Sequence, residues 1–91
     1  MAGIISYGVQ DCRQLKIVSV ISSFDTQGHI MPLYVRLNGE SLKIHNATLL
    51  PDSTFQLRLF RCEVMDQGAV KPIKLTYHVK EMMWSMPSAA Y

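Results

Sequence analysis

The side chains that could carry out covalent chemistry in strand-like parts of this sequence are the thiol of Cys62 and the imidazole of His78. A nucleophilic thiol needs a nearby base and a setting that lowers its pKa. Cys62 alternates with Phe60 and Val64, so we expect it to point into an apolar core, where a thiol is inert. The sequence contains no GxSxG, P-loop or GxGxxG motif. We therefore predict a protein that is not an enzyme, with no catalytic residue and no cofactor.

The same thiol and the histidines must also be considered as metal ligands. No two of Cys62, His29, His45 and His78 have the C-x₂₋₄-C or H-x₃₋₅-H spacing of zinc sites. The second cysteine, Cys12, lies far from Cys62 and forms no CxxC motif with it. We expect surface histidines, no bound metal and reduced thiols in an intracellular protein.

Basic residues with an aromatic neighbour form a candidate nucleic-acid surface. Small β-barrels bind single strands with a basic groove and stacking aromatic rings. Alternation along residues 32–44 directs Tyr34, Arg36 and Lys43 to one face. Neighbouring strands extend this face if they align. The candidate nucleic-acid-binding residues are Tyr34, Arg36, Lys43, Arg58 and Lys74, with Arg61 and Lys71 as extensions.

An ordinary solvated face explains the same residues without a ligand. Charged side chains alternate outward on any half-buried sheet, and lysines on strands protect exposed edges. Glu40, Glu63 and Glu81 interrupt the basic run, and the net charge is only +2. Such a charge permits a polyanionic partner but does not require one. Nucleic-acid binding is therefore the alternative function, after protein binding.

The segment MMWSM near the end of the chain holds three methionines and the only tryptophan. In so small a domain these side chains are most simply core residues. If Trp84 is half exposed, a tryptophan with methionine neighbours is a common anchor for a partner. The candidate protein-binding residues are therefore Met83, Trp84 and Met86. The expected partner is an unidentified protein or a second copy of the chain, joined as a homodimer along a sheet edge.

Strands must position these residues, and residues 32–44 predict a β-hairpin. Asn38-Gly39 between alternating apolar residues is the strongest short hairpin signal, because both central positions of a type I′ turn need positive φ. This turn sets Leu37 opposite Glu40, and Tyr34 and Arg36 opposite Lys43 and Ser41. We expect two apolar pairs to point inward together, namely Val35 with Leu42 and Leu33 with Ile44.

Four further segments predict strands from their β-branched or alternating apolar residues, at residues 16–24, 54–65, 70–77 and 82–86. In the second of these, Leu59 and Phe60 are consecutive apolar residues, so we expect a β-bulge there that bends the strand. Asp66-Gln67-Gly68-Ala69 is interpreted as a repeat of the turn pattern at Asp25-Thr26-Gln27-Gly28.

The regular spacing of short strands predicts an all-β fold, a small bent antiparallel barrel of five or six strands, SH3-like or OB-like, without substantial helix. An open meander that dimerises through an edge is the alternative. A length of 91 residues, 48% apolar and 18% charged, fits one globular domain over residues 1–91 and argues against a disordered chain. Within it we expect an irregular arm or edge strand at 1–15, the barrel at 16–86 and a loose tail at 87–91.

No apolar run approaches the ~20 residues that a membrane span needs. The N-terminus also lacks the basic start of a secretory signal, and its apolar run at Ile4-Ile5 is too short. We therefore expect a cytoplasmic protein that has no membrane partner.

The run SSFDxxGxIxPLYVRLNG, followed by FRCEV, KPIKLTYH and a terminal tryptophan, resembles small uncharacterised bacterial domains of SH3-like build. The likeness covers most of residues 16–86. Its motifs mark strands and turns and imply no activity. Together with the residues above, it predicts a non-enzymatic bacterial binding module.

Overall fold

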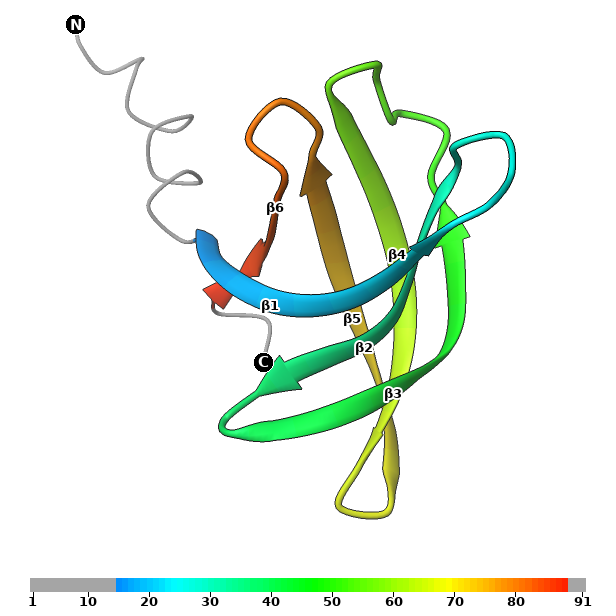
Figure 1. Ribbon diagram of the computed structural model, residues 1–91. Coiled ribbons are helices and arrows are strands. Elements are labelled where there is room, and N and C mark those ends of the chain that lie inside the picture. The colour runs from blue at the N-terminus through cyan, green and yellow to red at the C-terminus, as the bar shows by residue number, and fades with distance from the viewer. Residues whose placement is uncertain (1–14, 89–91) are drawn as a thin grey trace, which may run out of the picture.

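The computed structural model describes residues 15–88. These residues form six antiparallel strands that close into a barrel (Figure 1). Each strand pairs with its neighbour in chain order, and the last strand returns to the first. The predicted small all-β barrel is confirmed, and the open meander is wrong because the sheet closes. The strands are β1 (Leu15–Phe24), β2 (Ile30–Leu37), β3 (Glu40–Leu49), β4 (Leu57–Asp66), β5 (Ala69–His78) and β6 (Met83–Pro87).

Most of the predicted arm and most of the predicted tail cannot be compared with the structure. Residues 1–14 of the expected arm and residues 89–91 of the expected tail lie outside the described residues. Leu15 begins β1 and Pro87 ends β6, and these two residues pair with each other.

β1 closes the barrel because it bends and pairs on both sides. Its first part, Leu15 to Val18, pairs with β6, and its second part, Ser19 to Phe24, pairs with β2. The curved blue strand in Figure 1 crosses the molecule between these two partners.

The predicted hairpin between β2 and β3 is confirmed, with the predicted register. Asn38 and Gly39 have φ values of 50° and 82°, as a type I′ turn requires. The observed pairs are Tyr34 with Lys43, Val35 with Leu42, Arg36 with Ser41 and Leu37 with Glu40.

One member of the predicted inward set does not point into the core. Val35, Leu42 and Ile44 are buried, whereas Leu33 is 39% exposed. Ile21 pairs with Tyr34 while Ser22 pairs with Pro32, so Leu33 is the extra residue of a β-bulge. The bulge turns Pro32 inward and leaves Leu33 and Tyr34 outside.

The predicted bulge at Leu59-Phe60 is also wrong. β4 pairs with β5 without interruption from Leu57 to Asp66, so its even-numbered residues stay on one face. That face is the inner one, because Phe60, Cys62 and Val64 are buried. The irregularity lies instead on β3, where Ile44 and Asn46 pair with Val64 and Glu63 and leave His45 as the additional residue.

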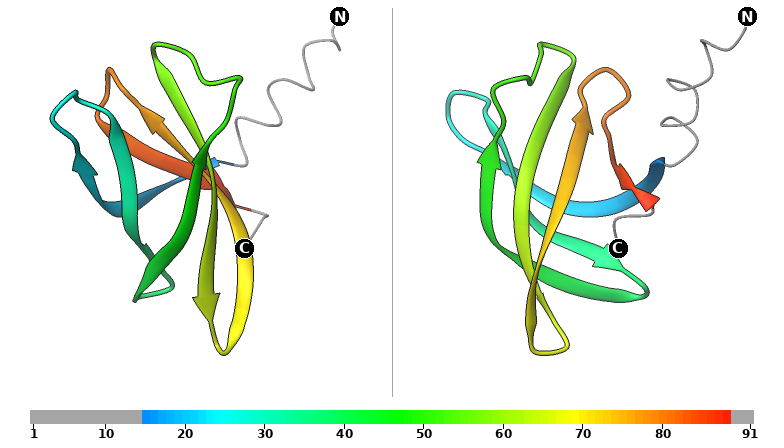
Figure 2. Two further views of the ribbon diagram at one scale, coloured as in Figure 1. Left: turned by 90° about the vertical axis from the view of Figure 1, so that its right-hand side faces the viewer. Right: turned by 180° about the vertical axis from the view of Figure 1, so that it is seen from behind.

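The connections differ between the two ends of the barrel (Figure 2). One end has two tight hairpin turns, at Asn38-Gly39 and at Gln67-Gly68. In the second turn, the φ values of Gln67 and Gly68 are 54° and 80°. The turns predicted at Asp66–Ala69 and at Asp25–Gly28 are both present, and the turn at Gln67-Gly68 has two positive φ values, as the turn at Asn38-Gly39 does. The other end has longer connections at residues 25–29, 50–56 and 79–82.

The core fills the barrel from the end with the tight turns to a layer of three aromatic rings. Phe60 and Tyr77 contact Trp84 with ring centroids 5.8 Å and 5.0 Å away, so the three rings form one layer. The buried apolar residues are Val35, Leu37, Leu42, Ile44, Phe60, Cys62, Val64, Ile73, Leu75, Trp84 and Met86.

The bulge in β2 predicts different costs for two leucines of the same hairpin. We expect Leu42→Ala to lower the free energy of unfolding by about 2–5 kcal/mol, because it opens a cavity in the core. Leu33→Ala should cost less than about 1 kcal/mol, since its side chain is largely outside. Urea unfolding of both variants measures this. Equal losses would mean that the strand is regular and that Leu33 faces inward.

Candidate functional site

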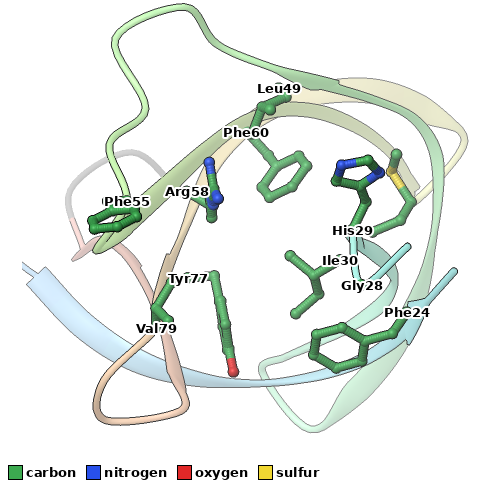
Figure 3. A pocket seen from close by; sticks show the side chains of 11 residues that line it. Phe24, Gly28, His29, Ile30, Leu49, Phe55, Arg58, Phe60, Tyr77 and Val79 are labelled. Carbon is green, nitrogen blue, oxygen red and sulfur yellow. The ribbon is translucent and has the colours of Figure 1, made fainter. Parts of the chain in front are cut away.

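The longer loops surround an open pocket of about 290 Å³ at one end of the barrel, which we call the mouth (Figure 3). Side chains from β1, β2, β3, β4 and β5 and from all three loops line it. Figure 3 shows them arranged around a central space. The lining residues are Phe24, Gly28, His29, Ile30, Met31, Leu49, Phe55, Arg58, Phe60, Tyr77 and Val79.

The mouth is open because the core ends at the layer of Phe60, Tyr77 and Trp84. Above Phe60, the next inward position on β4 is Arg58, and a guanidinium cannot complete an apolar core. Phe24 also lines the pocket but remains 62% exposed. The wall of the pocket is mostly apolar, as in many ligand pockets, and part of it is exposed to solvent.

Arg58 is the cation of this pocket. It pairs with Tyr77 across the β4–β5 ladder and follows the parity of Phe60, so it lies on the inner side of the barrel. Within residues 15–88, Lys71 forms an ion pair with Asp66, and the Asp25 carboxylate lies 3.2 Å from His29 Nδ1. No hydrogen bond or ion pair joins the Arg58 side chain to any of these described residues. The half-buried guanidinium therefore has room for an acceptor.

Phe55 stands at the rim on an ordered loop. The Thr54 hydroxyl accepts hydrogen bonds from the backbone N–H groups of Gln56 and Leu57, at 3.2 Å and 3.0 Å. The Ser53 hydroxyl accepts one from the Leu59 N–H at 2.9 Å. The Phe55 ring is nevertheless 79% exposed. The exposed ring is therefore carried by a loop whose backbone is hydrogen-bonded.

The opposite rim is held by Asp25. One carboxylate oxygen accepts hydrogen bonds from the backbone N–H groups of Gln27 and His29, at 2.8 Å and 2.9 Å. The other oxygen lies 3.2 Å from His29 Nδ1. The hydrogen bond from the His29 backbone is the main cause that lowers the pKa of Asp25. The rim therefore carries an anionic charge here, and His29 belongs to a turn.

The predicted nucleic-acid residues do not share one face. Tyr34, Arg36 and Lys43 lie on the outer side of β2 and β3, where Tyr34 and Arg36 border a hollow of about 190 Å³. Lys74 lies on the outer side of β5 opposite Arg61 of β4. Arg58 lies in the mouth, because β4 lacks the predicted bulge.

The predicted protein-binding residues are mostly core. Trp84 is 6% exposed and Met86 is 0% exposed, whereas Met83 is 41% exposed. The condition for an anchoring tryptophan, half exposure, is therefore not met, and Trp84 and Met86 fill the barrel.

Cys62 and His78 lie on opposite faces of the sheet. Cys62 is completely buried, and burial raises the pKa of its thiol to about 12. His78 follows the inward residue Tyr77, and its Nε2 lies 2.8 Å from the Ser85 hydroxyl. These positions do not form a thiol–imidazole pair. Among the described residues there is also no group of three or more His, Cys, Asp or Glu side chains placed to hold a metal ion.

Sequence reasoning missed the aromatic residues of the mouth. The predicted strands 16–24 and 54–65 include Phe24 and Phe55 without a binding role; Phe24 does end β1, whereas Phe55 lies in the loop before β4. Both residues adjoin turn signals, at Asp25 and at residues 51–53. An aromatic ring next to a loop was the available signal. Tyr77 gave no such signal, since it alternates regularly with Leu75 and Ile73.

Comparisons of the chain with protein-family models, with curated proteins and with solved structures give no match. The resemblance to bacterial SH3-like domains therefore stays a prediction. No helix within residues 15–88 has the length and apolar character to cross a bilayer.

Proposed function

We propose that this protein is a non-enzymatic, intracellular binding domain whose mouth receives an apolar side chain of a protein partner. The observation that carries the proposal is the pocket of about 290 Å³ with exposed Phe24 and Phe55 at its rim. Its volume lies near the lower end for ligand sites, which suits one aromatic or aliphatic side chain. Aromatic residues, phenylalanine included, are enriched in protein interfaces relative to the rest of the surface.

The exposed rings also provide the driving force. Phe24 is 62% and Phe55 79% exposed, so an occupant would remove much of their surface from water. Covering about 100 Å² of apolar surface contributes about 2.5 kcal/mol. Because hydrogen bonds already hold the loop backbone on both sides of Phe55, less backbone entropy is lost on binding.

A sheet edge is a less suitable surface for self-association. Along residues 69–75, β5 pairs with β4 on one side, while its pairing with β6 begins at Thr76. This stretch contains Lys71, Pro72 and Lys74. Proline cannot donate to a new ladder, and lysines discourage strand addition. The mouth is thus the better site for a partner, and the partner is a different protein.

The mouth proposal predicts selective binding of apolar peptides. We expect short peptides that present Phe or Leu, internally or at an end, to shift the amide NMR signals of residues 25–29 and 50–56 in the full chain. Peptides with Ser at the same position should not. Trp84, which contacts Tyr77 beneath the pocket, should report binding by fluorescence.

Variants at both ends of the barrel control this experiment. Phe55→Ser should weaken peptide binding about tenfold or more, equivalent to about 1.4 kcal/mol. Val70 is 57% exposed beside the tight turn at the opposite end of the barrel, and Val70→Ser should leave peptide binding unchanged. No binding by any apolar peptide, or shifts confined to β2 and β3, would contradict the proposal.

Nucleic-acid binding is the second candidate, supported by the outer face of the hairpin. Tyr34 and Lys43 are cross-strand partners, and Arg36 borders the hollow beside Tyr34. A ring beside two cations suits a stacked base and its phosphate. Fewer basic residues support it than the sequence predicted, because Arg58 and Lys74 lie elsewhere.

This candidate predicts salt-dependent binding of single-stranded oligonucleotides. Phosphate contacts release counterions, so affinity must rise as salt is lowered. Fluorescence anisotropy at two salt concentrations would measure this, with Arg36→Gln as the test variant and Lys80→Gln, on the β5–β6 turn, as the control. Absence of binding at low salt would eliminate nucleic acid as a partner.

A further inference from the structure

The mouth combines an apolar wall with a cation, Arg58, that forms no ion pair within residues 15–88. Arg58 lines the pocket, and none of the ion pairs or hydrogen bonds within residues 15–88 involves its side chain. In the open mouth, water can reach the guanidinium. An occupant that fills the pocket displaces this water.

That displacement restricts which occupants can bind. A charge that loses its water without gaining a partner is disfavoured. An uncharged apolar side chain would therefore bind less tightly than an occupant that also offers the guanidinium an acceptor. An occupant carrying an anionic group beside its apolar part would instead form charge-assisted hydrogen bonds, and the planar guanidinium matches a carboxylate in bidentate geometry.

The charges of the rim favour a single anionic group. Arg58 is the one arginine or lysine among the lining residues, and Asp25 at the other rim is anionic. His29 of the lining is engaged with Asp25. A polyanion would place further charges toward Asp25, where they are repelled. The site therefore suits one carboxylate and disfavours a nucleic-acid strand.

The spacing along β4 places that carboxylate close to the inserted ring. Arg58 and Phe60 are two residues apart on one face, about 7 Å apart along the strand. A ring packed on Phe60 and Tyr77 thus has Arg58 within reach of its own main chain. In an extended peptide the next side chain points to the opposite face. The carboxylate of the inserted residue itself, at a chain end, meets this requirement best.

We propose that the mouth recognises the C-terminal end of a partner protein that ends in an aromatic residue. The ring fills the pocket over Phe60 and Tyr77, and the terminal carboxylate pairs with Arg58. This inference rests on the proposed function, because it names the part of the protein partner that enters the mouth.

The test compares the peptide Gly-Ser-Gly-Ser-Phe as a free acid and as a C-terminal amide, by calorimetry with the full chain. The free acid should bind about tenfold or more tightly than the amide. Arg58→Gln should bring this ratio close to one. Arg61→Gln, the outward arginine of the same strand, should preserve it. Thermal unfolding confirms that each variant folds, and Arg58→Lys, which keeps the charge, should retain part of the preference.

The outcomes separate this inference from the proposed function. Equal affinity of acid and amide for the wild-type protein would overturn the role of the carboxylate and leave the apolar mouth intact. If neither they nor any other apolar peptide bind, both proposals fall. Binding of N-acetylphenylalanine as tight as that of the peptide would overturn the protein terminus as occupant, because the pocket would then be a site for small aromatic acids.

Discussion

The backbone pairing of β1 with both β2 and β6 is the constraint on which the rest of the structure depends. One bent strand joins the two halves of the sheet, so that Val18 lies opposite Trp84 and Val20 opposite Val35. This closure surrounds the core rings with strands on all sides. Trp84, the only tryptophan of the chain, is thereby buried, and a residue that could have served as a surface anchor holds the barrel together.

The connections between the strands determine which end of the closed barrel has an open pocket. At the tight-turn end, two-residue turns bring the strands together. At the other end, longer loops keep the strand ends apart above the layer of Phe60, Tyr77 and Trp84. The inward position beyond Phe60 on β4 is Arg58, which cannot seal the interior. The pocket thus results from the same alternation that builds the core, continued past the last apolar residue.

The hairpin was predictable from the sequence because its signal is local. Asn38-Gly39 selects a turn type, and the turn type sets the register of the neighbouring pairs. The bulges at Leu33 and His45 were not predictable in this way. A bulge reconciles a strand with the curvature of the closed sheet, which depends on distant strands. Leu33 fits the apolar alternation of its strand, so nothing in the sequence marks it as an extra residue. His45 looks like an ordinary polar residue of a strand.

The error at Leu59-Phe60 had the largest consequence for the site. Two consecutive apolar residues suggested a change of face, but β4 is regular and Leu59 is a partly exposed residue opposite Thr76. A small barrel leaves much apolar surface outside, so an extra leucine need not mark a bulge. The mistaken phase placed Arg58 on the outer face and hid the mouth. The resemblance could not correct it, because its motifs mark strands and turns.

The face of β4 that carries Arg58 decides whether the mouth contains a cation. Nuclear Overhauser contacts in the labelled protein would decide this. We expect contacts from the Arg58 methylenes to the rings of Phe60 and Tyr77, and from the Leu59 methyl groups to the outward side chain of Thr76. Contacts from Leu59 to the Phe60 and Tyr77 rings, with none from Arg58, would contradict the account, because the mouth would then contain no cation.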